Sequence, residues 1–158
     1  MNSPGEAIPE RGRIAGIDFG TVRIGIALSD AGRRIASPFE NYTRRGPQPD
    51  ADRFRRLVEE EAVTLFVIGL PVHLDGRESQ KSAEARQFGR WLHEATGLPV
   101  EFFDERFTSS QAEGMLLDAQ MTSRRRKRRL DMLAAQIILS AYLESSGKGR
   151  EAPGSLDD

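Results

Sequence analysis

Acidic residues at three separate places in the sequence could together carry out metal-dependent chemistry. Asp18 ends an apolar run, Asp104 and Glu105 follow a second short apolar run, and Asp131 stands at the start of an apolar helical pattern. Strands disfavour Asp, and a half-buried carboxylate is costly unless a partner, a metal ion or hydrogen bonds compensate it. Acids arriving from a first strand, a later strand and the last helix could gather oxygen ligands for Mg²⁺ or Mn²⁺.

Asp18 and Asp131 also have ordinary structural explanations. Asp18 could simply begin a turn, because Asp is common at the start of hairpin turns. Asp131 could cap its helix or face the helix dipole, as first-turn Asp residues often do. Strand alternation turns Asp104 away from Glu105, so Asp104 is a weaker, fourth candidate ligand.

Basic residues gather just before the last of these acids. Side chains of this kind neutralise phosphates and make nucleic-acid binding strongly salt-dependent. The run could also be a solvated charged face, but it abuts a candidate metal ligand, and we therefore favour nucleic-acid binding. The candidate nucleic-acid-binding residues are Arg23, Arg106, Arg124, Arg125, Arg126, Lys127, Arg128 and Arg129.

Other residues with reactive or aromatic side chains carry less information. His73 is predicted in a loop after a central strand, where it could shuttle a proton, although loop histidines are more often incidental. His93 falls inside a predicted helix. Trp91 and the phenylalanines recur at helical spacing, which favours a place in the core over a role in stacking on bases.

The composition indicates one globular domain with a charged surface. Of the 158 residues, 38% are apolar and 30% are charged, which suffices for a core but not for two full lobes. The net charge of -1 argues neither for nor against nucleic acid, so the uneven distribution of charge is the useful signal. With no cysteine, a metal must be held by oxygen or by the two histidines.

The ends of the sequence read as disordered tails, over residues 1–12 and 146–158, on either side of one domain at 13–145. Apolar runs nowhere approach the length of a membrane span, and the N-terminal residues lack the apolar core of a signal peptide. We therefore expect a cytoplasmic protein without membrane contact, and the sequence leaves its oligomeric state open.

The apolar pattern predicts a mixed α/β fold. Three strands form an antiparallel meander, and the strands that follow alternate with helices, which implies right-handed crossovers and parallel pairing. This order predicts a mixed five-stranded sheet with helices on both faces. Pro38 and residues 44–50 are expected to interrupt regular structure. The predicted elements are strands over 14–18, 22–29 and 33–37, a helix over 50–62, a strand over 64–68, a helix over 79–96, a strand over 100–103, and helices over 108–118 and 130–143.

One face of the first hairpin is expected to be smooth. Gly16 and Asp18 share a face by strand alternation, and Gly25 and Ala27 would stand opposite them if pairing keeps like with like. Small residues let a helix or a substrate backbone come close, although ordinary packing explains them equally well. Ligands of open α/β sheets bind beyond the carboxyl ends of the strands, which selects Asp18, the loop at 69–76 and Asp104-Glu105.

Four motifs, in order, resemble the YqgF family of Holliday-junction-resolvase-like proteins. They are DFGTVRIGIALSD at 18–30, IGLPVHLDG at 68–76, FDERFTSSQAE at 103–113 and KRRLDMLAAQIILSAYL at 127–143. The resemblance covers about residues 13–145. It implies a ribonuclease-H-like fold, in agreement with the strand order predicted above, and it implies that Asp18, Glu105 and Asp131 form the acidic site.

The resemblance also implies an activity. It points to a phosphodiester-hydrolysing nuclease that uses Mg²⁺ or Mn²⁺ and processes the 5′ end of pre-16S ribosomal RNA. Two such ions about 3.5–4 Å apart can activate water and stabilise the leaving oxygen, although three acids do not decide between one ion and two. A Holliday-junction or branched-DNA resolvase would use the same chemistry.

Two functions of other classes remain open at this stage. A non-catalytic nucleic-acid-binding module would keep the basic run without needing all three acids. An ATPase or sugar kinase of the actin-like fold is less favoured, because that fold binds its nucleotide between two lobes and this chain supplies one.

Overall fold

The computed structural model describes residues 11–71, 78–108 and 123–145, with side chains in the last range described for residue 130 and for 132–145. The elements are β1 (Arg13–Asp18), β2 (Arg23–Ser29), β3 (Ala36–Thr43), α1 (Pro47–Glu61), β4 (Val63–Leu70), α2 (Gln80–Thr96), β5 (Val100–Asp104), the 3₁₀ turn η1 (Glu105–Phe107) and α4 (Ser123–Glu144). Residues 1–10 of the predicted N-terminal tail, the whole predicted C-terminal tail and residues 109–118 of the predicted third helix lie outside the described residues. None of the described helices has the length and apolarity that crossing a membrane requires.

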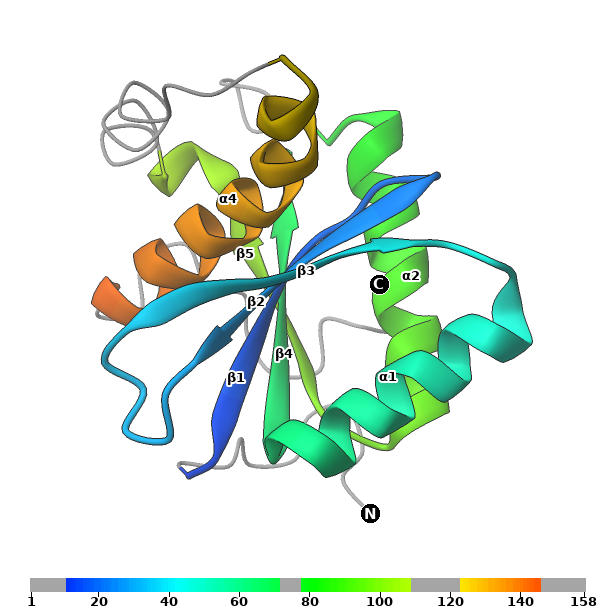
Figure 1. Ribbon diagram of the computed structural model, residues 1–158, viewed down its shortest axis with the longest axis horizontal. Coiled ribbons are helices and arrows are strands. Elements are labelled where there is room, and N and C mark those ends of the chain that lie inside the picture. Colours follow the sequence, from blue (N-terminus) through cyan, green and yellow to red (C-terminus); the bar gives the residue numbers. More distant parts are fainter. Residues whose placement is uncertain (1–10, 72–77, 109–122, 146–158) are drawn as a thin grey trace.

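The strands form a mixed five-stranded sheet in the order β3-β2-β1-β4-β5 (Figure 1). The pairs β3-β2 and β2-β1 are antiparallel, whereas β1-β4 and β4-β5 are parallel. The predicted fold class is confirmed, including the meander that leads into the parallel strands. The parallel pairs direct the carboxyl ends of β1, β4 and β5 to one edge of the sheet.

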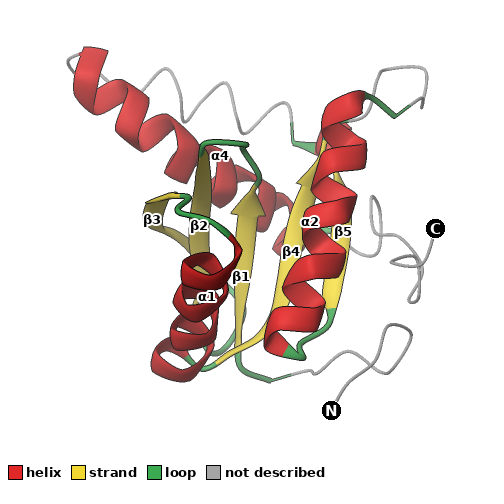
Figure 2. Ribbon diagram, turned by 90° about the vertical axis from the view of Figure 1, so that its right-hand side faces the viewer, coloured by secondary structure: helices red, strands yellow, loops and turns green. Residues whose placement is uncertain are grey.

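Helices cover both faces of the sheet, as predicted. Helices α1 and α2 lie on one face and α4 crosses the other (Figure 2). The core under α1 and α2 is rich in aromatic rings, with Phe54, Phe66 and Phe102 fully buried. The core under α4 is mostly aliphatic, and both Ile14 of β1 and Leu139 of α4 are buried in it. The strand β4 is buried on both sides, which is why its sequence is continuously apolar.

The ends of α2 follow ordinary capping chemistry. The hydroxyl of Ser79 accepts a hydrogen bond from the Ser82 backbone N–H at 3.2 Å, and Gly97 ends the helix in the left-handed conformation. The hydroxyls of Ser79 and Ser82 each donate to the Pro71 carbonyl at 3.1 Å. The start of α2 is therefore fastened to the chain leaving β4, at the carboxyl edge of the sheet.

The predicted third strand was misplaced. Asp30 accepts hydrogen bonds from the backbone N–H groups of Arg34 and Ile35, so these residues belong to the turn and the strand runs over Ala36–Thr43. Pro38 does not interrupt it, because β3 is an edge strand and its register shifts opposite Ala27. Residues 44–50 were also expected to be irregular, but α1 begins at Pro47, a residue type suited to the first turn.

The last helix begins seven residues earlier than predicted, at Ser123. Arg and Lys are good helix formers, so the basic run 124–129 extends the helix instead of preceding it. Asp131 consequently lies in the interior of α4, and the explanation that it caps the first turn is excluded.

The smooth face of the first hairpin receives α4. The register pairs Gly16 with Ala27 and Asp18 with Gly25, as expected from matching small residues. A Cβ added to Gly16 would lie 2.7 Å from Cβ of Leu139 and 3.1 Å from the Ala135 carbonyl oxygen. Only glycine therefore lets α4 approach β1 this closely.

Candidate active site

Asp18 and Glu105 lie at the same edge of the sheet and line one cleft. Asp18 ends β1 and Glu105 follows β5, and β4 runs between these two strands. The cleft has a volume of about 390 Å³. Its lining residues are Asp18, Phe19, Gly20, Thr21, Arg23, Gly69, Pro71, Lys81, Glu84, Ala85 and Glu105.

The first hairpin fixes the position of Asp18. Its cross-strand partner is Gly25, which presents no side chain beside the half-buried Asp18. A Cβ on Gly20 would lie 2.3 Å from the carbonyl oxygen of Arg23, so this tight turn requires glycine. The turn holds Asp18 at the end of its strand and brings Arg23 to the wall of the same cleft.

Glu105 is presented by a short turn that Asp104 caps. The Asp104 carboxylate accepts a hydrogen bond from the Arg106 backbone N–H at 2.9 Å, and Nε of Arg106 lies 2.8 Å from the same carboxylate. Burial, and then the charge of Asp104, raise the pKa of Glu105, while the nearby ammonium of Lys81 opposes this shift. A partly buried carboxyl that is costly to ionise is well suited to receive a cation.

The structure separates the roles of Asp104 and Glu105. Asp104 caps the turn and pairs with Arg106, and it is not among the residues that line the cleft. Its weak candidacy as a fourth ligand therefore finds no support. Arg106 is exposed beside the cleft, and its ion pair with Asp104 holds it there.

The remaining predicted site residues are placed only through the backbone of α4. Arg124, Arg125, Arg126, Lys127, Arg128, Arg129 and Asp131 all belong to this helix, and their side chains lie outside the described set. His73 also lies outside the described residues. His93 is structural, since its Nδ1 lies 2.7 Å from the Leu98 carbonyl oxygen near the end of α2.

The sequence matches the family model described as "RuvX: Holliday junction resolvase" over residues 12–145, most of the chain. The chain belongs to the RuvX family. This match confirms the resemblance read from the four motifs, and it spans β1 through α4.

Curated relatives of the RuvX-family chain agree with this assignment. A Rhodopirellula baltica protein named "Putative pre-16S rRNA nuclease" is 42% identical over 154 residues, which cover 97% of this chain and 89% of the relative. A Syntrophomonas wolfei protein of the same name is 40% identical over 139 residues, covering 88% of this chain and 99% of the relative. The RuvX-family chain thus spans nearly the full length of these proteins.

A solved structure supports the fold assignment. The Thermus thermophilus RuvC structure matches the RuvX-family chain with a TM-score of 0.50 at 12% identity, covering 88% of this chain and 98% of that one. At this identity the match concerns the fold alone, and it agrees with the predicted ribonuclease-H-like architecture.

The carboxylates of the cleft are suitable ligands for a hard cation, but the described side chains do not form a complete metal site. Among the described side chains, no three or more His, Cys, Asp or Glu residues come together in a way that could hold a metal ion. Three carboxylates, Asp18, Glu84 and Glu105, line the cleft, and the chain has no thiolate to compete with oxygen ligands. Oxygen donors of this kind suit Mg²⁺ or Mn²⁺.

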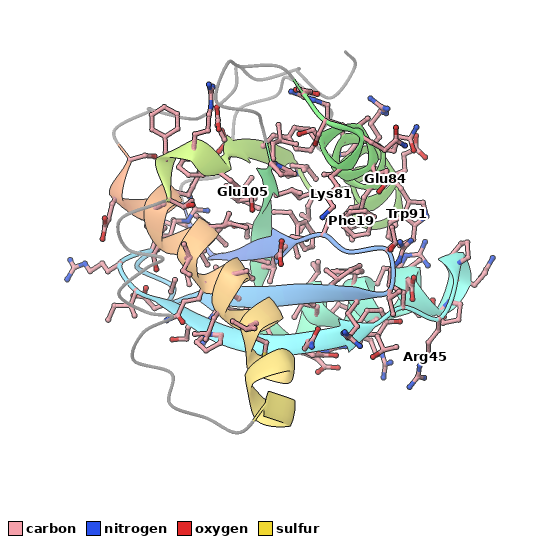
Figure 3. All side chains as sticks on the ribbon, turned by 90° about the horizontal axis from the view of Figure 1, so that it is seen from above. Phe19, Arg45, Lys81, Glu84, Trp91 and Glu105 are labelled. Atoms are coloured by element: carbon pink, nitrogen blue, oxygen red, sulfur yellow. The ribbon has the colours of Figure 1, made fainter. Side chains whose placement is uncertain are left out.

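Sequence reasoning missed two charged residues of the cleft, Lys81 and Glu84. Both lie in the first turns of α2 and line the cavity beside Glu105 (Figure 3). The sequence order could have indicated them. The helix over 79–96 follows a parallel strand, so its first turns lie at the carboxyl edge of the sheet, where ligands bind.

Proposed function

We propose that this RuvX-family protein is a divalent-metal-dependent nuclease that hydrolyses phosphodiester bonds. The observation that carries the proposal is the convergence of Asp18 and Glu105 on one cleft from strands on either side of β4. This is the edge where open α/β sheets bind their ligands. Curated relatives with the name of a nuclease support the same reaction class.

Asp131 is the third carboxylate of the proposed site. In a helix, residues four and seven positions apart share a face. Position 131 precedes Ala135 by four residues and Ile138 by seven, and these two contact the sheet at Gly16 and Gly69. The helical spacing thus favours a place for Asp131 on the sheet-facing side of α4.

In the proposed mechanism Asp18, Glu105 and Asp131 would hold Mg²⁺ or Mn²⁺ through their oxygens. The ion, when bound, supplies an activated water and charge stabilisation for the leaving oxygen. Arg23 and Lys81 line the same cleft and would hold the substrate phosphate by charge. The partial burial of Glu105 limits access of bulk water to the carboxylate.

The proposed substrate is the 5′ end of pre-16S ribosomal RNA, acted on in the cytoplasm. The names of the curated relatives support this substrate, and the basic run 124–129 supports contact with a nucleic-acid backbone. Branched DNA is the second candidate substrate, because the family model carries the description of a Holliday junction resolvase. Contacts to phosphates by themselves do not distinguish the two.

Cleavage of labelled substrates tests both parts of the proposal. We expect Mg²⁺- or Mn²⁺-dependent cleavage of a pre-16S RNA 5′ leader, with a four-way DNA junction as the competing substrate. Asp18→Asn, Glu105→Gln and Asp131→Asn should each lower the rate by about 100-fold or more, since loss of even an outer-shell partner commonly costs 10–100-fold. Asp52→Asn is the matched control, because Asp52 is exposed on α1 and outside the cleft. Unchanged cleavage in Asp18→Asn would refute the site assignment.

A further inference from the structure

A second cavity opens directly beside the cleft and is walled by aromatic rings. We call it the aromatic groove, and its volume is about 260 Å³. It shares Phe19, Thr21 and Glu84 with the cleft, so the two cavities are adjacent. Figure 3 shows Glu105, Lys81, Phe19 and Trp91 following one another along this edge of the molecule. The groove is lined by Phe19, Thr21, Arg44, Pro47, Glu84, Gln87, Phe88 and Trp91.

Three rings of the groove stack on one another at shallow angles. The ring centroids of Phe19 and Phe88 are 4.8 Å apart with an interplanar angle of 33°. Those of Phe88 and Trp91 are 5.5 Å apart at 31°. Phe88 is buried in the middle, whereas Phe19 and Trp91 at the two ends are only partly buried. The stack therefore packs on the core, as its spacing predicted, and still presents ring surface to the groove.

A positive charge is fixed over the same rings. The Arg44 guanidinium carbon lies 5.2 Å from the Phe19 ring centroid and 5.9 Å from that of Phe88. Nη1 of Arg44 donates to the Thr21 carbonyl at 3.4 Å, and Nε lies 3.6 Å from the buried carboxylate of Asp50. Arg44 is thus held in place while a third of its side-chain surface remains exposed.

We infer that the aromatic groove binds an unpaired nucleotide of the substrate, with its base against the Phe19–Phe88–Trp91 stack and its phosphate near Arg44. This inference rests on the proposed nuclease function. Aromatic platforms combined with cationic side chains are the general means of holding single-stranded nucleic acid. Phe19 follows Asp18 directly in sequence, so a base held here adjoins the phosphate in the cleft.

The groove favours a single strand over a duplex. A base inside a duplex is already stacked on both faces and cannot offer one to a protein ring without unpairing. The groove is also lined by an acceptor, Glu84, and by Gln87, whose amide can both donate and accept, so polar groups are available for the edge of a base. A volume of about 260 Å³ is near the lower end of small-ligand pockets, which suits one nucleotide better than a duplex or a peptide.

Intrinsic fluorescence tests the inference on the unmodified protein, because Trp91 is the single tryptophan of the chain. We expect a short oligoadenylate, titrated in buffer with EDTA, to quench the Trp91 emission. An abasic strand of equal length and a blunt RNA duplex should leave it unchanged at equal occupancy, which is measured separately by anisotropy. Equal quenching by all three probes, or none by any while anisotropy reports binding, would overturn the inference.

Variants then connect the groove to substrate affinity. Trp91→Ala should weaken oligoadenylate binding about five-fold or more, because one base stack on an aromatic ring contributes 1–3 kcal/mol. Trp91→Phe should retain most of the affinity and shows that the fold tolerates a change here. Phe39→Ala is the matched control, since Phe39 is a partly exposed aromatic on β3 outside both cavities. Thermal unfolding of each variant verifies the fold, and unchanged affinity in a folded Trp91→Ala protein would contradict the inference.

The two proposals fail in different ways. If wild-type protein cleaves no nucleic acid with Mg²⁺ or Mn²⁺, the proposed nuclease function is wrong whatever Trp91 reports. If cleavage occurs but an abasic nucleotide at each position around the cut leaves the rate unchanged, the nucleotide subsite alone is wrong. The expected result is a several-fold loss of rate for an abasic nucleotide at one position next to the scissile phosphate.

Discussion

A Cβ added to Gly69 would lie 3.0 Å from Oε1 of Glu105 and 2.6 Å from Cδ1 of Ile138. Gly69 is buried near the end of β4, between the two strands that carry Asp18 and Glu105. The missing side chain therefore leaves room for both the Glu105 carboxylate and Ile138 of α4. Because Gly69 has no side chain, α4 can pack against β4 next to Glu105 at the candidate site.

Gly69→Ala should impair the site more than the fold. The added methyl group must push aside either Glu105 or α4, and overpacking of this kind costs about 1–3 kcal/mol of unfolding free energy. We expect a loss of Mn²⁺ affinity, measured by calorimetry, that exceeds the loss seen at an exposed glycine. Gly32→Ala is that control, because a Cβ there would meet only a carboxylate oxygen of Asp30, at 3.2 Å, far from the cleft residues. Equal Mn²⁺ affinity in both variants would contradict the idea.

Lys81 should set the pH range in which the site takes up a metal. Its ammonium opposes the rise in the pKa of Glu105 that burial and Asp104 cause. In Lys81→Gln the Glu105 pKa should rise further, so protons compete with the metal at higher pH than in wild type. Mn²⁺ binding followed by calorimetry across the acid range should show this displacement toward higher pH. Arg56→Gln on α1, outside the cleft, should show none.

Two substitutions of Asp104 should distinguish its role in capping the turn from the effect of its charge on the pKa of Glu105. Asp104→Ala removes the acceptor for the Arg106 N–H, loosens the turn that presents Glu105 and should weaken Mn²⁺ binding several-fold. Asp104→Asn keeps an acceptor oxygen but loses the charge that raises the Glu105 pKa. Asn should therefore restore affinity and move the acid limit of binding to lower pH. If Asn and Ala behave alike, Asp104 is not a positioning residue.

Much of the fold was predictable because local pattern and tertiary context agree. The continuous apolar run of β4 predicted a strand covered on both faces, and the small residues around Gly16 were compatible with the close approach of a helix, as one of the alternatives left open. The errors fall where context overrides local preference. Pro38 is tolerated only because β3 is an edge strand, and the start of α4 was missed because residues 123–129 show no apolar period.

The candidate site was predictable to the extent that single strands present it. Asp18 is the last residue of β1 and Glu105 directly follows β5, so the rule on carboxyl ends sufficed to bring them together. The positions of Lys81 and of the aromatic groove depend on how α2 packs against the first hairpin. A local sequence pattern does not predict that packing. Trp91 illustrates the difficulty, because the same helical spacing serves both a core position and a groove wall.

A buried hydrogen bond joins Tyr42 to Asp50, the carboxylate that faces Arg44 of the aromatic groove. The Tyr42 hydroxyl donates to Asp50 at 2.6 Å, and Asp50 also accepts from the Arg45 backbone N–H at 2.9 Å while facing Arg44. Tyr42→Phe leaves the buried carboxylate one donor short, which should lower the unfolding free energy by about 1.5–3 kcal/mol. Chemical denaturation near neutral pH measures this loss.

The same bond should also limit stability in alkali. Burial and the Asp50 hydrogen bond raise the pKa of Tyr42 to about 12, against about 10 in the unfolded chain. Because the folded pKa is the higher one, the contribution is complete below pH 10 and is lost as the pH rises from about 10 to about 12. Tyr42→Phe should lack this component and lose less stability than wild type over that range. Parallel loss in the two proteins would show that Tyr42 ionisation is not coupled to unfolding.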